Sequence, residues 1–67
     1  MSQTKLRGRI YEKFGSQSRF ATAMGMDSVA INRRLNGSIP WKLPEVERAV
    51  KLLEIPTSEV WIYFFTE

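Results

Sequence analysis

Four side chains between residues 28 and 33 have types and a spacing that suit the recognition of DNA bases. Ser28, Val29, Asn32 and Arg33 stand at positions i, i+1, i+4 and i+5, which places them in one stripe along an α-helix. All four are short or forked, so the stripe fits the major groove of a duplex. Arginine pairs there with guanine, asparagine with adenine, and valine touches the thymine methyl group. The alternative is an ordinary solvated helix face, but the small, polar neighbours of Arg33 favour the DNA role.

Residue types that carry catalysis and metal binding are missing. The sequence contains no histidine and no cysteine, which removes the commonest general base and the commonest nitrogen and sulfur ligands of metals. No two carboxylates have a spacing that indicates a shared site. We therefore expect no enzymatic activity, no metal site and no cofactor. The longest apolar run, Val60–Phe65, is too short to span a bilayer, and its acidic surroundings disfavour binding to anionic lipid.

Charge is distributed unevenly along the chain. Residues 1–42 contain eight lysines and arginines against two acidic residues, a net charge of +6, whereas residues 43–67 contain two against five, a net charge of −3. A basic body with a separate acidic end indicates a polyanion at one face. Ordinary solvated surface explains the charges equally well.

The apolar pattern predicts an all-α domain of five short helices, and 67 residues suffice for one domain. Helix starts are indicated by Thr4, Ser16 and Asp27 as N-caps and by Pro44 at a first position. Glycines and prolines end the helices, and the inward positions are Leu6, Ile10, Phe14, Phe20, Ala21, Met24, Ile31, Leu35, Val46, Ala49, Val50 and Leu53. The two C-terminal helices are expected within residues 43–65. Residues 60–65 suit a strand by composition, but the preceding caps and the spacing of Val60 and Phe64 favour a short helix.

Residues 16–37, SQSRFATAMGMDSVAINRRLNG, contain two short helices that meet at a glycine turn. This stretch resembles the Cro/CI-type (XRE) helix-turn-helix of phage and bacterial transcriptional regulators. The matching residues are Gln17, Ala21, Gly25, Ile31 and the closing Leu35-Asn36-Gly37, and the flanking LRGRIYEKFG and LLEIP…YFF extend the likeness to nearly the whole chain.

The resemblance implies a lambda-repressor-like fold with one helix-turn-helix domain over residues 1–67. It implies that Gln17 bonds a phosphate and also contacts a neighbouring recognition side chain. Ser28, Val29, Asn32 and Arg33 would face base edges, while Asn36, Gly37, Ser38 and Lys42 would approach the DNA backbone. Arg34 departs from the family pattern, which often has an apolar residue there. For Arg34, a phosphate contact and simple solubility are equally good interpretations.

The function implied is a transcriptional regulator, a repressor of phage or prophage type that binds a double-stranded operator. Because one recognition helix reads few base pairs, we expect a homodimer. Its surface is assigned to the C-terminal aromatics Trp61, Phe64 and Phe65, which a small core has difficulty burying together. We expect a cytoplasmic protein that associates with the nucleoid. The alternative is a protein-interaction module on a helix-turn-helix scaffold that binds another regulator, for example an antirepressor or a co-regulator.

Overall fold

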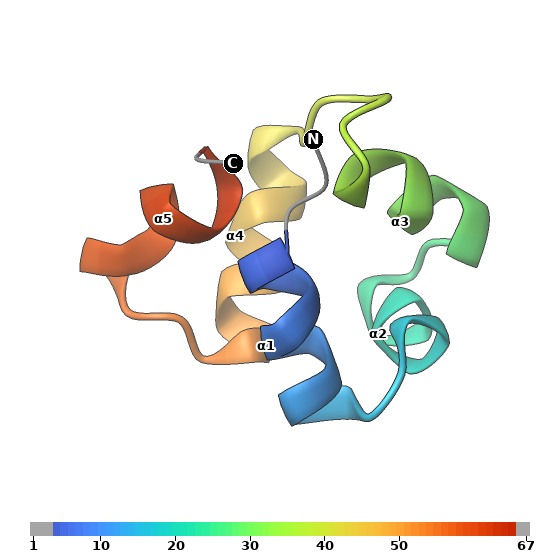
Figure 1. Cartoon of the computed structure of the whole chain (residues 1–67), viewed down its shortest axis with the longest axis horizontal. Helices are drawn as coiled ribbons and strands as arrows, with labels where there is room; N and C mark the ends of the chain where they lie inside the picture. Colours follow the sequence, from blue (N-terminus) through green and yellow to red (C-terminus); the bar gives the residue numbers. More distant parts are fainter. Residues whose placement is uncertain (1–3, 66–67) are drawn as a thin grey trace.

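Five α-helices form the part of the chain that the structure describes, as the apolar pattern predicts. The computed structural model describes residues 4–65, and these contain helices, turns and one 3₁₀ turn. The helices are α1 (Thr4–Phe14), α2 (Gln17–Met24), α3 (Ser28–Leu35), α4 (Leu43–Leu53) and α5 (Val60–Phe64), and the 3₁₀ turn η1 (Thr57–Glu59) leads into α5. In Figure 1, α2 and α3 lie on one side of the molecule and α5 lies on the other. No helix among the described residues is both long and apolar enough to cross a membrane.

The short helices α2 and α3 are delimited by caps that the sequence predicts. The Ser16 hydroxyl accepts a hydrogen bond from the Arg19 amide at 3.1 Å, and the Asp27 carboxylate accepts one from the Ala30 amide at 2.8 Å. Each bond satisfies an amide that has no partner inside its helix. Gly25 ends α2 with φ of 74°, in the left-handed region that glycine adopts without a steric penalty. Only Met26 and Asp27 lie between Gly25, which ends α2, and Ser28, which begins α3.

The core draws on every helix. Its buried apolar residues are Leu6, Ile10, Phe20, Ala21, Met24, Ile31, Leu35, Val46, Ala49, Leu53, Ile55 and Phe64. The predicted inward positions are confirmed, except that Phe14 and Val50 are only partly buried. Ile31 and Leu35 fix the inner side of α3, which leaves the opposite side of that helix open to solvent. The core thus determines which residues α3 presents.

The C-terminal segment is helical, which resolves the choice between strand and helix. Phe64 is 4% exposed, and its ring packs edge-on against Trp41 with 5.3 Å between the ring centroids. The assignment of Phe64 to a dimer surface was therefore wrong, because its side chain belongs to the core. Trp61 and Phe65 remain 58% and 69% exposed.

Candidate recognition surface

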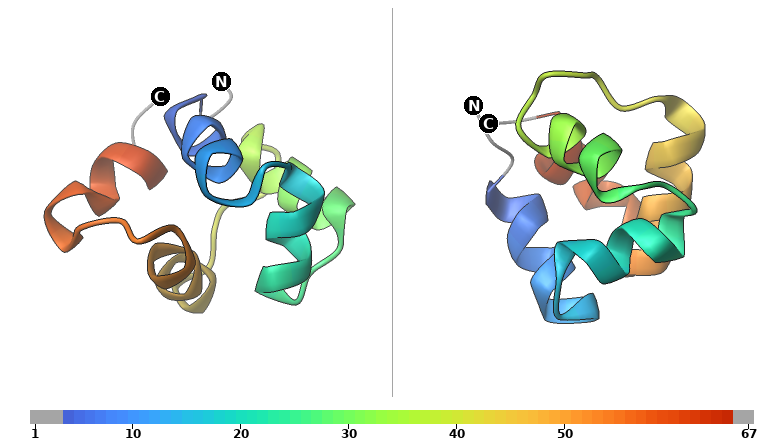
Figure 2. Two further views of the ribbon diagram at one scale, coloured as in Figure 1. Left: turned by 90° about the horizontal axis from the view of Figure 1, so that it is seen from below. Right: turned by 90° about the vertical axis from the view of Figure 1, so that its right-hand side faces the viewer.

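The outward side of α3 carries the stripe that the sequence predicts. Ser28, Val29, Asn32 and Arg33 are all exposed, while Ile31 on the inner side is fully buried. In the right panel of Figure 2, α2 and α3 face the viewer and α5 lies behind them. The four side chains are therefore available to a partner on the side of the molecule opposite α5.

A polar chain connects three helices beside this stripe. The Gln17 amide group lies 3.5 Å from the Asn32 side-chain oxygen, at the outer limit of a hydrogen bond, and Arg7 donates to Gln17 Oε1 at 3.0 Å. The predicted contact between Gln17 and a recognition side chain is present. Sequence reasoning missed Arg7, because nothing along the chain indicates that α1 reaches the start of α2. Arg7 thus orients Gln17, whose amide group points toward Asn32, one exposed member of the stripe.

The loop after α3 is shaped by its own hydrogen bonds. The Asn36 side-chain oxygen accepts from the Ser38 amide at 3.3 Å and from the Ser38 hydroxyl at 2.8 Å. The Arg33 carbonyl accepts from the amides of Ser38 and Ile39 at 2.9 and 3.3 Å, which folds the loop back onto the end of α3. Asn36, Gly37, Ser38 and Lys42 are exposed, as a contact with a partner requires.

Arg34 lies inside the protein. Its guanidinium donates from Nε and Nη2 to the two carboxylate oxygens of Glu45, at 2.8 and 2.9 Å, and from Nη1 to the Ala30 carbonyl at 3.0 Å. Arg34 is 9% exposed. A phosphate cannot reach a guanidinium whose donors are engaged in this way. The structure therefore corrects the predicted phosphate contact: Arg34 joins α3 to α4.

Glu45 completes this junction and was not identified from the sequence. Besides Arg34, it accepts a hydrogen bond from the Lys42 amide at 2.9 Å, so its carboxylate also caps α4. The hydrogen bond from Arg34 is the main cause that holds the pKa of Glu45 below its ordinary value, against an opposing effect of burial. The available signal was the departure of Arg34 from an apolar position, because a buried arginine requires an acid.

Several other cations are also engaged in contacts within the protein. Arg9 donates to two main-chain carbonyls at the end of α4, at 2.9 and 3.0 Å, and Arg48 donates to the Met24 carbonyl at the end of α2, at 2.7 Å. Lys13 forms an ion pair with Glu54 at 3.1 Å. Cations at helix C-termini stabilise the helices. Within residues 1–42, Arg9, Lys13 and Arg34 thus serve the fold, which weakens the interpretation of the basic charge there as a footprint for a polyanion.

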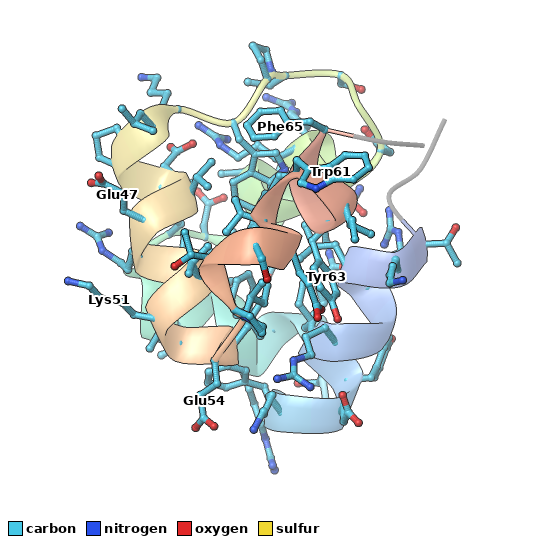
Figure 3. The ribbon with its side chains drawn as sticks, turned by 90° about the vertical axis from the view of Figure 1, so that its left-hand side faces the viewer. Glu47, Lys51, Glu54, Trp61, Tyr63 and Phe65 are labelled. Carbon is cyan, nitrogen blue, oxygen red and sulfur yellow. The ribbon has the colours of Figure 1, made fainter. Side chains whose placement is uncertain are left out.

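A second exposed surface lies on the other side of the molecule. Figure 3 shows Trp61 on α5 and Phe65 directly after it, with Glu47 and Lys51 on α4 and Glu54 at the end of α4. Tyr63 instead faces α1, where the Lys5 ammonium lies 5.8 Å from the centre of its ring. The chain therefore presents two candidate surfaces: the polar α3 stripe and an aromatic surface on α5.

These features define a small all-helical domain of five helices with exposed surfaces on two opposite sides. The chain belongs to the family described as "Protein of unknown function (DUF739)", whose model matches residues 2–67. It is also similar to the modulator of repression of the temperate bacteriophage TP901-1 from Lactococcus lactis, known from a solution structure. The identity is 37% with a TM-score of 0.84, over 97% of this chain and 88% of the phage protein. No curated protein sequence matches the chain.

Proposed function

We propose that this protein is a phage-type regulator of repression that acts by binding another regulator protein. The observation that carries the proposal is the similarity, over almost the whole chain, to a phage protein described as a modulator of repression. A modulator of repression requires a repressor on which to act. The protein is then an interaction module on a helix-turn-helix scaffold, and it works in the bacterial cytoplasm where the repressor and its operator are found.

Several arginines are bonded to other groups of the protein, and this supports a protein partner over DNA. Binding to a duplex depends on several phosphate contacts from lysine and arginine, each of which releases counterions. Arg9, Arg34 and Arg48 instead donate to groups of the protein itself. Arg33 is the one charged side chain among the four members of the α3 stripe. A stripe with so little charge is poorly suited to contact with a phosphate backbone.

A reporter assay in bacteria tests the proposal. A strain carries the operator-controlled reporter, with or without the repressor encoded by the same phage, and the protein is expressed in both. We expect reporter output to change only where the repressor is present, and the two purified proteins to form a complex in sedimentation. A change of output without the repressor would contradict the proposal and favour direct binding to DNA.

Direct recognition of a double-stranded operator is the second candidate function. The exposure of Ser28, Val29, Asn32 and Arg33, together with the contact of Gln17 with Asn32, favours it. This function requires a homodimer, for which Trp61 and Phe65 offer exposed apolar groups. Selection from random DNA followed by a salt titration tests it. Arg33→Ala would then weaken binding by about 1–3 kcal/mol at one base position, whereas absence of any enriched site at low salt excludes the function.

A further inference from the structure

We propose that Trp61 on α5 and Phe65 directly after it are the anchors by which this protein docks into an apolar cleft, bordered by basic side chains, on its protein partner. The inference rests on the proposed function and deepens it, because it identifies the surface that binds the repressor. The α3 stripe, the surface that the sequence singles out, lies on the opposite side of the molecule.

The geometry of α5 turns both rings outward together. Phe65 is the C-cap of α5, and its amide donates to the Trp61 carbonyl at 2.9 Å, as in one further helical turn. Residues four apart in such a turn lie on the same side, so Trp61 and Phe65 form one pair. Phe64, between them in sequence, is directed into the core, where it contacts Trp41. The buried Phe64 fixes the rotation of α5, and the rotation in turn keeps Trp61 and Phe65 at 58% and 69% exposure. Aromatic anchors on a helix are a recurring way to enter a groove of another protein.

The small area of the pair argues against a second copy of the chain as the occupant. A buried tryptophan or phenylalanine contributes about 150–250 Å², so the exposed parts of the two rings offer roughly 250 Å². A stable interface buries about 800 Å² on each partner. Two flat patches of this size placed together fall well short of that area. A cleft that surrounds the rings also contacts the surface beside them, so it buries more area on both proteins than two flat patches do.

The acidic character of the C-terminal half indicates the border of the cleft. Residues 43–67 carry a net charge of −3, and Glu59 immediately precedes α5. Glu47 and Lys51 lie on the edge of α4 away from the rings (Figure 3) and act on a partner through the wider field of the surface. In a twofold contact between identical surfaces, like carboxylates would be brought together. A partner with lysine or arginine around its cleft meets these carboxylates with the opposite charge.

The experiment measures binding of the full-length repressor encoded by the same phage to the full chain. In a Trp41→Phe background, 5-fluorotryptophan labels Trp61 alone. We expect its ¹⁹F resonance to shift and broaden when the unlabelled repressor is added. Trp61→Ser combined with Phe65→Ser should weaken binding at least tenfold. Tyr11→Ser is the matched control, since Tyr11 is an aromatic side chain of α1 with 60% exposure, against 58% for Trp61; it should change the affinity less than twofold.

Charge variants test the basic border independently. Glu47→Lys should weaken binding and reduce its dependence on salt, whereas Lys51→Glu should strengthen binding. The binding variants and their control replace exposed side chains, so circular dichroism should show that each keeps its helices. Trp41→Phe replaces a half-buried ring that packs against Phe64, so the same measurement and the repressor affinity of that background are compared with the wild type first.

Three results would overturn the inference. If the Trp61 and Phe65 double variant binds the repressor with wild-type affinity, these residues are not the docking surface, but the proposed function still stands. If the wild-type chain alone forms a dimer and the double variant does not, the surface binds a second copy of the chain. Absence of binding by the wild-type chain overturns the proposed function and, with it, this inference.

Discussion

Arg34 of α3 and Glu45 of α4 form a two-bond ion pair that fixes the third helix against the fourth. The two N···O distances are 2.8 and 2.9 Å, and the side chains are 10% and 15% exposed. The Glu45 carboxylate also accepts a hydrogen bond from the Lys42 amide, and this bond connects the end of the loop after α3 to the start of α4. One carboxylate therefore holds the helix that carries the stripe, the loop that follows it and the next helix. The orientation of the α3 stripe depends on a residue outside it.

Removal of the negative charge at this junction should cost more stability than any nearby surface change. We expect Glu45→Gln to lower the free energy of unfolding by about 2–3 kcal/mol, because it leaves a nearly buried guanidinium without its counter-charge. Urea denaturation followed by circular dichroism measures the difference. Glu47→Gln is the matched control, an exposed carboxylate of the same helix, and should change stability by less than about 0.5 kcal/mol. Equal effects of the two variants would contradict the structural role of Glu45.

The same carboxylate should make stability depend on pH. The pKa of Glu45 is lower in the folded chain than its ordinary value of 4.5. Its contribution to stability is therefore complete above the unfolded value and is lost as the pH falls through the folded value. We expect the wild-type chain to lose stability between pH 5 and the folded pKa, and Glu45→Gln to lose less over the same interval. Parallel pH profiles of the two proteins would show that other carboxylates cause the loss.

Local rules of the sequence were sufficient for the helices and for the outward stripe. Ser16, Gly25 and Asp27 act within a few residues of their own positions, and the inward spacing of Ile31 and Leu35 determines which side of α3 is exposed. The pairing of Arg34 with Glu45 joins residues from two helices, and no local pattern specifies it. Phe64 was misassigned for a related reason: its burial depends on Trp41, 23 positions earlier in the chain.

Two glycines with equal space around them should respond in opposite directions to alanine. A Cβ added at Gly8 or at Gly25 meets no atom within 4 Å, but Gly25 has φ of +74° whereas Gly8 lies within α1. We expect Gly8→Ala to raise the free energy of unfolding by about 0.5–1 kcal/mol, because glycine is a poor helix residue. Gly25→Ala should lower it by about 1 kcal/mol, because alanine is strained in the left-handed region. Thermal unfolding of both variants checks the pair, and a stabilised Gly25→Ala would contradict the tight turn between α2 and α3.

Glu54 ends α4 in a conformation that suits glycine better than glutamate. Its φ is 54°, and among the described residues it is the one non-glycine with positive φ. Glu54→Gly should relieve about 1 kcal/mol of strain, part of which is offset by the greater freedom of glycine in the unfolded chain and by loss of the exposed pair with Lys13. Arg9 keeps its bond, because it donates to the Glu54 main-chain carbonyl. Lys13→Met isolates the ion pair, so Glu54→Gly in that background reports the backbone alone. We expect a gain of about 0.5 kcal/mol there in urea denaturation, and a loss would show that the left-handed cap at the end of α4 carries no strain.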